Sequence, residues 1–138
     1  MKVVSALAIT VAVVAACGGD GSDVPEDERV RQVSGVAELA ANAYAAAGAE
    51  GLYDYLAEEV TAVCSKQGLA QALDTQPVPE GFVRTESVEF DGDSARAKVV
   101  QRVQDNGDVK EVEAEWTFVS VDDSWRIAHV PELEGCRN

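Results

Sequence analysis

The sequence is poor in basic residues. It has 11 lysines and arginines against 25 aspartates and glutamates, which gives a formal net charge of -14 at pH 7. Proteins that bind nucleic acid, or that lie on an anionic membrane surface through a polybasic helix, need clustered basic side chains. The sequence has no such cluster, so both kinds of binding are excluded. We interpret the acidity as a solvated surface rather than a store for cations.

Familiar catalytic and metal-binding motifs are also missing. The chain has one histidine and three cysteines, and it contains no HExxH, CxxC, phosphate-binding loop or nucleophile elbow. Residues 91–94 and 105–108 resemble calcium loops superficially, but both lack the third ligand and the distal glutamate of an EF-hand. We expect hairpin turns at both places. The sequence therefore predicts no metal, no cofactor and no catalytic residue.

The chain has no apolar run long enough to cross a bilayer. The longest one extends from Val3 to Ala16, whereas a membrane-spanning helix needs about 20 residues. Lys2 precedes this run and Cys17 follows it, so it has the length and the flanks of a secretory h-region. One interpretation is an ordinary signal peptide that is cut nearby and leaves Cys17 as a free thiol.

The end of this run, Val14-Ala15-Ala16-Cys17-Gly18, resembles the lipobox of bacterial lipoproteins. The resemblance implies that residues 1–16 are removed and that Cys17 carries diacylglycerol, usually with an acylated amino group. Two or three acyl chains anchor a protein firmly. Residues 17–24 would then form a lipidated tether, rich in glycine, serine and aspartate, and residues 25–138 the folded domain. We therefore expect a secreted protein held by lipid at the extracytoplasmic face of the cell membrane.

The first part of this domain has helical periodicity. Apolar residues recur at three- and four-residue steps between 30 and 47, which predicts an amphipathic helix that ends at Gly48. Leu39 is among the residues expected to widen its buried stripe. Residues 52–63 form a second stretch with one apolar face, and Ser65 is a candidate N-cap for a short third helix.

The residues after the proline-rich segment 76–81 are strand-like. Apolar and polar residues alternate over 112–118 and 125–128, the period of a half-buried strand. Turn residues at 92–93, 106–107 and 122–123 predict three hairpins. These loops imply cross-strand pairs Glu89–Arg96, Phe90–Ala95, Ala97–Trp116, Lys98–Glu115, Val99–Ala114, Arg102–Glu111 and Phe118–Ile127. The predicted fold is α+β, with N-terminal helices packed on a curved four-stranded antiparallel meander.

Helices followed by a meander that ends in Glu115-Trp116-Thr117-Phe118-Val119 and Asp123-Ser124-Trp125-Arg126-Ile127-Ala128 resemble the nuclear transport factor 2-like superfamily. The closest likeness is to its small secreted bacterial lipoproteins, and it covers roughly residues 25–131. The resemblance implies a curved sheet wrapped around a long first helix to form a cone. Members include isomerases, dehydratases, polyketide cyclases of the SnoaL type and non-catalytic binding domains, so the fold does not determine function.

The predicted inner face of the cone supplies the candidate pocket residues. A period of two places Arg84, Glu86, Gln101 and His129 on this face, where aromatic side chains could line a mainly apolar cleft. His129 could serve there as a base, or it could simply lie at the end of the last strand. The candidate pocket residues are Tyr44, Glu86, Trp116 and His129.

Three functions remain open on this evidence. We expect a non-catalytic binding or accessory module whose partner is a small apolar ligand or another envelope protein. The alternatives are an isomerase, cyclase or hydrolase that uses the cone, and a structural surface antigen or dimerising spacer. A deep cone with a buried His129 would favour the enzyme, whereas a cone filled by side chains would favour the accessory module.

The two cysteines that follow the tether are expected to pair. With Cys17 lipidated, Cys64 and Cys136 remain in an oxidising compartment, and their even number predicts a disulfide. Two separate thiols, one of them buried, are the alternative.

Overall fold

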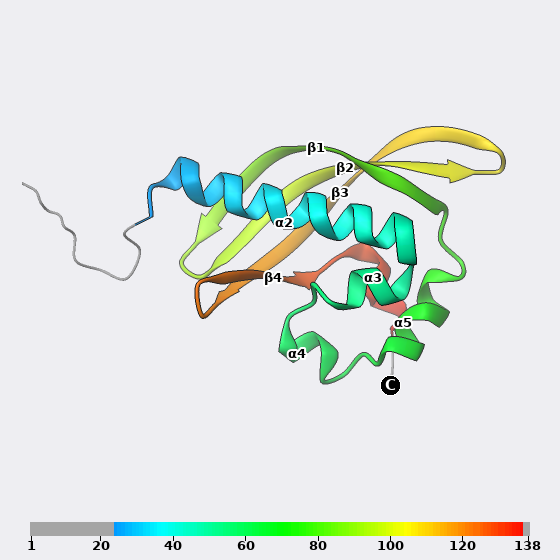
Figure 1. Cartoon of the computed structure of the whole chain (residues 1–138), viewed down its shortest axis with the longest axis horizontal. Helices are drawn as coiled ribbons and strands as arrows, with labels where there is room; N and C mark the ends of the chain where they lie inside the picture. Colours follow the sequence, from blue (N-terminus) through cyan, green and yellow to red (C-terminus); the bar gives the residue numbers. More distant parts are fainter. Residues whose placement is uncertain (1–23, 137–138) are drawn as a thin grey trace, which may run out of the picture. The chain divides into compact units, whose positions relative to one another are not determined.

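The computed structural model describes residues 24–136 of the chain (Figure 1). The predicted signal peptide (1–16), the lipidated Cys17 and the tether up to residue 23 lie outside the described residues. Residues 24–30 and residues 31–136 fall in two separate units, and the sheet, the core and the short helices belong to the second unit. Within the described part, no helix combines the length and the apolar character that a membrane span requires.

The first described element is a long helix, α2 (Glu26–Ala47), as its periodicity predicts. Its buried positions are Val33, Ala37, Ala40, Ala41 and Tyr44. The helix ends at Gly48, whose φ of 64° lies in the left-handed region that favours glycine. Leu39 does not join the buried stripe, because it is 59% exposed. Each residue turns the helix by about 100°, so Leu39 points away from the face shared by Ala37 and Ala40.

Three short helices follow: α3 (Ala49–Tyr53), α4 (Glu58–Thr61) and α5 (Lys66–Leu73). Ser65 is the N-cap of α5, as predicted, because its hydroxyl accepts a hydrogen bond of 3.0 Å from the backbone N–H of Gly68. This bond satisfies one of the N–H groups that the first turn of a helix leaves without an intrahelical partner.

The predicted second helical stretch, 52–63, is divided between α3 and α4. The backbone between the two helices pairs instead with the last strand of the sheet. The N–H of Ala57 donates to the carbonyl of Ile127 at 2.8 Å, and the N–H of Ile127 donates to the carbonyl of Tyr55 at 2.8 Å. These bonds draw residues 55–57 out of the helical conformation. Helical periodicity indicates which residues share an apolar face. It cannot show that the edge of a sheet will take the backbone hydrogen bonds of the same residues.

The remaining chain forms a four-stranded antiparallel sheet in the order β1-β2-β3-β4, which confirms the predicted meander. The strands are β1 (Val78–Asp91), β2 (Ser94–Asp105), β3 (Asp108–Val121) and β4 (Ser124–His129). Every predicted cross-strand pair is present. At the β2–β3 turn, Asn106 and Gly107 have φ values of 56° and 86°, as a two-residue hairpin loop with positive φ at both positions requires.

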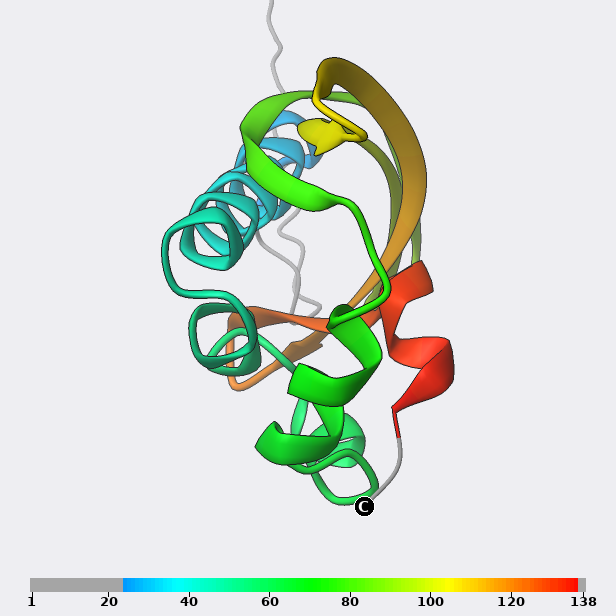
Figure 2. The ribbon, with the colours of Figure 1, turned by 90° about the vertical axis from the view of Figure 1, so that its right-hand side faces the viewer.

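The sheet curls around one side of α2 and remains open (Figure 2). Its concave face and the helices enclose the core, whose largest buried side chains include Trp116, Phe118 and Ile127, each at most 1% exposed. Burial of an aromatic or branched apolar side chain stabilises the fold by about 1.5–3 kcal/mol. Ala37 and Ala40 are fully buried opposite them, and such small side chains let the helix approach the sheet closely.

Within the first strand, Arg84 and Glu86 lie on the face opposite to the one that a period of two predicts. Register shifts interrupt β1 at Phe82–Arg84 and at Thr85–Ser87, and each extra residue turns the following side chains to the other face of the sheet. Arg84 consequently pairs with Val100 and lies on the convex face. Glu86 joins it there, with its Oε2 atom 2.8 Å from an Nη atom of Arg84.

Cys64 and Cys136 form a disulfide, as predicted, with their Cα atoms 5.5 Å apart. Cys64 lies between α4 and α5. Cys136 follows η2 (Pro131–Gly135), a 3-10 helix beyond the last strand. Because η2 packs beside α5 (Figure 2), the bond joins the C-terminal segment to the helical layer.

Candidate functional site

Buried side chains line the concave side of the sheet. Tyr44 from α2 and Trp116 from β3 are 5% and 1% exposed, and both belong to one continuous hydrophobic cluster. Gln101 also lies on this face, as predicted, and is 3% exposed. The structure therefore brings Tyr44 and Trp116 into the same core, where they pack against neighbours.

The other two candidate pocket residues lie outside this core. Glu86 is on the convex face beside Arg84, for the reason given above. His129 pairs with Thr117 because a register shift separates that pair from Phe118 and its partner in β4. This shift turns His129 away from the inner face. Its side chain is 45% exposed, and its Nε2 atom lies 3.8 Å from a carboxylate oxygen of Glu134. Glu86 and His129 thus lie outside the buried cluster that contains Tyr44 and Trp116.

A buried carboxyl group lies near Tyr44. Burial raises the pKa of Glu132 above its ordinary value, and a backbone hydrogen bond and His129 oppose this shift. Burial, and then the negative charge of Glu132, raise the pKa of the Tyr44 hydroxyl. Within the described residues, Oε1 of Glu132 has no hydrogen-bond partner, and leaving such an atom unpaired costs about 1–3 kcal/mol. Sequence reasoning missed this group because Glu132 lies beyond the last strand, where no periodicity indicates burial.

A groove lies on the surface between α2 and the β3–β4 turn. Its volume is about 480 Å³, within the range of about 300–1,000 Å³ that is common for ligand sites. Side chains from three separate parts of the chain line it. The lining residues include Arg31, Gly35, Leu39, Tyr55, Trp125 and Arg126.

Hydrogen bonds and ring packing hold the β4 side of this groove in place. The indole Nε1 of Trp125 donates to Oε1 of Gln32 at 3.3 Å, which joins β4 to α2. The ring of Trp125 also packs against Phe90, with the ring centroids 5.7 Å apart. Nη1 of Arg126 donates to the backbone carbonyl of Asp54 at 2.6 Å. These contacts fix both side chains before any ligand binds.

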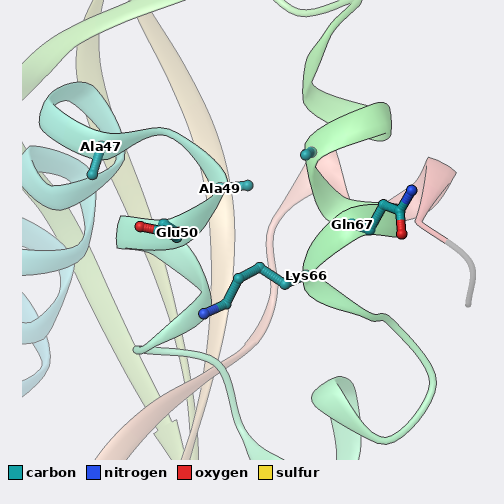
Figure 3. Close-up of a pocket in the computed structure, with 6 residues that line it drawn as sticks. Ala47, Ala49, Glu50, Lys66 and Gln67 are labelled. Carbon is teal, nitrogen blue, oxygen red and sulfur yellow. The ribbon is translucent and has the colours of Figure 1, made fainter.

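A second depression, of about 530 Å³, lies between α3 and α5 and is shown in Figure 3. Lys66 extends from α5 toward Glu50 of α3, and its ammonium group lies 5.5 Å from the centre of the Tyr53 ring. Three alanines form much of the remaining wall. One cation near one carboxylate, with no aromatic side chain among the lining residues, offers less for recognition than the groove beside Trp125.

The convex face of the sheet is covered by exposed ion pairs. The charged groups of Arg96 and Glu89 are 2.7 Å apart, and those of Lys98 and Glu113 are 3.8 Å apart. Such exposed pairs contribute about 0–1 kcal/mol each. Val100, on the same face, is only 3% exposed. Among residues 24–136, no cluster of three or more His, Cys, Asp or Glu side chains is arranged to hold a metal ion.

Sequence reasoning did not identify the groove. Residues 31–39 and 123–126 meet there, and no local sequence pattern predicts a contact between segments so far apart in the chain. Two weak signals are visible afterwards. Leu39 falls outside the helical stripe, and Gly35 lies in the middle of a helix whose other positions favour alanine.

Comparisons with known proteins show a similar fold but no family. No family model matches the chain, and none of the curated proteins matches it. Among solved structures, the chain is similar to a substituted form of Rv3472, a protein of unknown function from Mycobacterium tuberculosis. The TM-score is 0.52 and the identity 18%, over 80% of this chain and 75% of that chain. At this identity the likeness shows a shared α+β fold and nothing about function.

Proposed function

We propose that this protein is a lipid-anchored extracytoplasmic lipoprotein whose nuclear transport factor 2-like domain binds a partner molecule and catalyses no reaction. The observation that carries the binding part is the surface groove beside Trp125, lined by aromatic and charged side chains. A catalytic acid or base must lie within hydrogen-bond reach of a substrate proton. The candidate residues Tyr44 and Trp116 are buried in the hydrophobic cluster, whereas the groove is accessible to a ligand.

The titratable groups support binding over catalysis. His129 is the single histidine of the chain and therefore the usual candidate for a general base, yet it is half-exposed on the convex side. Glu132 and Tyr44 have raised pKa values, but neither side chain lines the groove or the depression beside Lys66. A perturbed pKa without access for a substrate is what burial alone produces.

The anchor is supported by the order of charge, apolar run, small residues and Cys17 in the sequence. The test is metabolic labelling with palmitate, followed by separation of membrane and soluble fractions. We expect the parent protein to be labelled and membrane-bound, and Cys17→Ser to lose both properties. Ser22→Ala, a nearby change that keeps the cysteine, should behave as the parent. Labelled, membrane-bound Cys17→Ser protein would show that the lipobox interpretation is wrong.

The binding part is tested by native mass spectrometry of protein extracted from the membranes of its own cells. We expect a second mass in fixed ratio to the polypeptide. The same mass should be retained by Ala46→Leu, which adds a leucine to α2 outside the groove, and lost from Gly35→Leu, which adds one inside it. Retention by both variants would place the ligand somewhere other than the groove.

A further inference from the structure

Gly35 has no evident structural reason to be glycine. It lies within α2, where glycine lowers helix stability relative to alanine. Its φ is not positive, and a Cβ atom built on it would meet no other atom within 4 Å. Neither backbone conformation nor close packing therefore requires glycine at this position. The absence of a side chain does, however, leave open the floor of the groove beside Trp125.

Aromatic and apolar side chains form the walls around Gly35. Tyr55 and Trp125 line one side of the groove, and Leu39 lies on the α2 side. Leu39 is 59% exposed, an unusual position for leucine when a helix has a buried face available. Aromatic side chains attract other rings by offset or edge-to-face packing. The walls therefore suit a ligand with an aromatic body.

Arg126 places a guanidinium at the rim of the groove, next to Asp123. A guanidinium has five N–H donors in a fixed plane. The hydrogen bond from Arg126 to the Asp54 carbonyl uses Nη1, so other donors of Arg126 remain for a ligand. An acidic group is complementary to these donors.

We propose that the groove binds a small aromatic acid, with its ring against Trp125 and Tyr55 and its acidic group at Arg126. This inference rests on the proposed binding function and adds the chemical class of the ligand. The volume of about 480 Å³ accommodates a body of one or two rings. Gly35 leaves room for that body, and Arg126 distinguishes the acid from a neutral molecule of the same shape.

Two fluorescent probes test the proposal. Anilinonaphthalene sulfonate has an aromatic body and one acidic group, and phenylnaphthylamine is the same molecule without the sulfonate. The protein is the whole mature chain, residues 17–138 with Cys17→Ser, so that no lipid competes for the probes. We expect saturable binding of both probes, with the sulfonate bound about two- to fivefold more tightly at physiological salt. The overall negative charge of the protein opposes this preference, so it would have to come from the rim.

Matched variants locate the binding. Gly35→Leu should weaken both probes at least about tenfold by filling the groove, whereas Ala46→Leu should bind them as the parent does. Arg126→Gln should remove the preference for the sulfonate and retain binding of the neutral probe. Arg96→Gln makes the same charge change on the convex face and should leave the preference unchanged. Circular dichroism and melting temperature establish that each variant is folded.

The experiment distinguishes failure of the proposed ligand class from failure of the groove as a binding site. If Gly35→Leu binds the sulfonate as tightly as Ala46→Leu, the probes bind elsewhere and the proposal is wrong. If Arg126→Gln keeps the preference for the sulfonate, or if the parent shows none, the groove does not select an acid. The proposed ligand class then fails, while binding in the groove stands. If neither probe binds the parent saturably, both the ligand class and the groove as a binding surface are refuted.

Discussion

Loss of the Cys64–Cys136 disulfide should cost this domain a large share of its stability. The bond joins residues 72 positions apart in the sequence. In the chain-entropy model, a cross-link that closes a loop of this length stabilises the folded state by about 4 kcal/mol. A domain of this size has a total stability of about 5–15 kcal/mol. For a domain of a little over one hundred residues, the loss corresponds to a fall in melting temperature of about 15 °C.

The assay compares two ways of removing the bond, because both sulfur atoms are buried. Cys64 and Cys136 are 3% and 6% exposed, so replacing them with alanine also removes packed atoms. Protein that is reduced in denaturant and refolded with reductant present keeps the sulfur atoms and loses only the cross-link. We expect the reduced parent to melt about 15 °C lower than the oxidised parent, and the double variant Cys64→Ala/Cys136→Ala to melt slightly lower still. Equal melting temperatures for oxidised and reduced protein would refute the reasoning, as would two free thiols in the alkylated, unreduced protein.

Three further predictions concern single residues. Glu132→Gln should raise the melting temperature at about pH 7.5 and have little effect at about pH 3.5. Burial raises the folded-state pKa of Glu132, so the ionised carboxylate destabilises the folded protein. This destabilisation is absent at low pH, where the group is protonated in both states, and it grows as the pH rises above the unfolded-state pKa. An equal effect at both pH values would contradict this. Gly51→Ala should destabilise the protein strongly, because its Cβ would collide with the carbonyl oxygen of Ala43, whereas Gly35→Ala should stabilise it by about 0.5–1 kcal/mol in urea denaturation. His129→Ala should change the unfolding free energy by less than about 0.5 kcal/mol, because the side chain is half-exposed; a larger loss would indicate a buried role.

Local turn chemistry explains why most of the sheet could be predicted. Asn106-Gly107 adopts positive φ at both positions, and a two-residue loop of this kind leaves one register for the strands that it joins. The charged and apolar faces of β2 and β3 then agree with that register. The register shifts in β1 could not be predicted in the same way. A bulge needs one extra residue, and the sequence around Arg84 reads as a plausible strand with or without it.

The candidate site was less predictable than the fold. The facing of Glu86 and His129 depended on an unbroken period of two, so two register shifts were enough to move both residues to the convex side. The groove depends on the meeting of α2 with the β3–β4 turn, which is a tertiary contact. The disulfide was predictable because the proposed extracytoplasmic location is oxidising, and the proposed lipidation of Cys17 leaves two cysteines, which can form one intramolecular pair.

The central claim is that a ligand binds at the surface groove and leaves the core of the curled sheet undisturbed. The chain has two tryptophans, and they report on these two places separately. Trp125 is 8% exposed and lines the groove at the edge of the core, whereas Trp116 is 1% exposed within the core. The most direct measurement is therefore a nuclear magnetic resonance titration of the two indole N–H signals with anilinonaphthalene sulfonate, assigned with Trp125→Phe. We predict that the Trp125 signal shifts saturably and the Trp116 signal stays in place; a saturable shift of Trp116 alone would place the ligand inside the sheet and contradict the account.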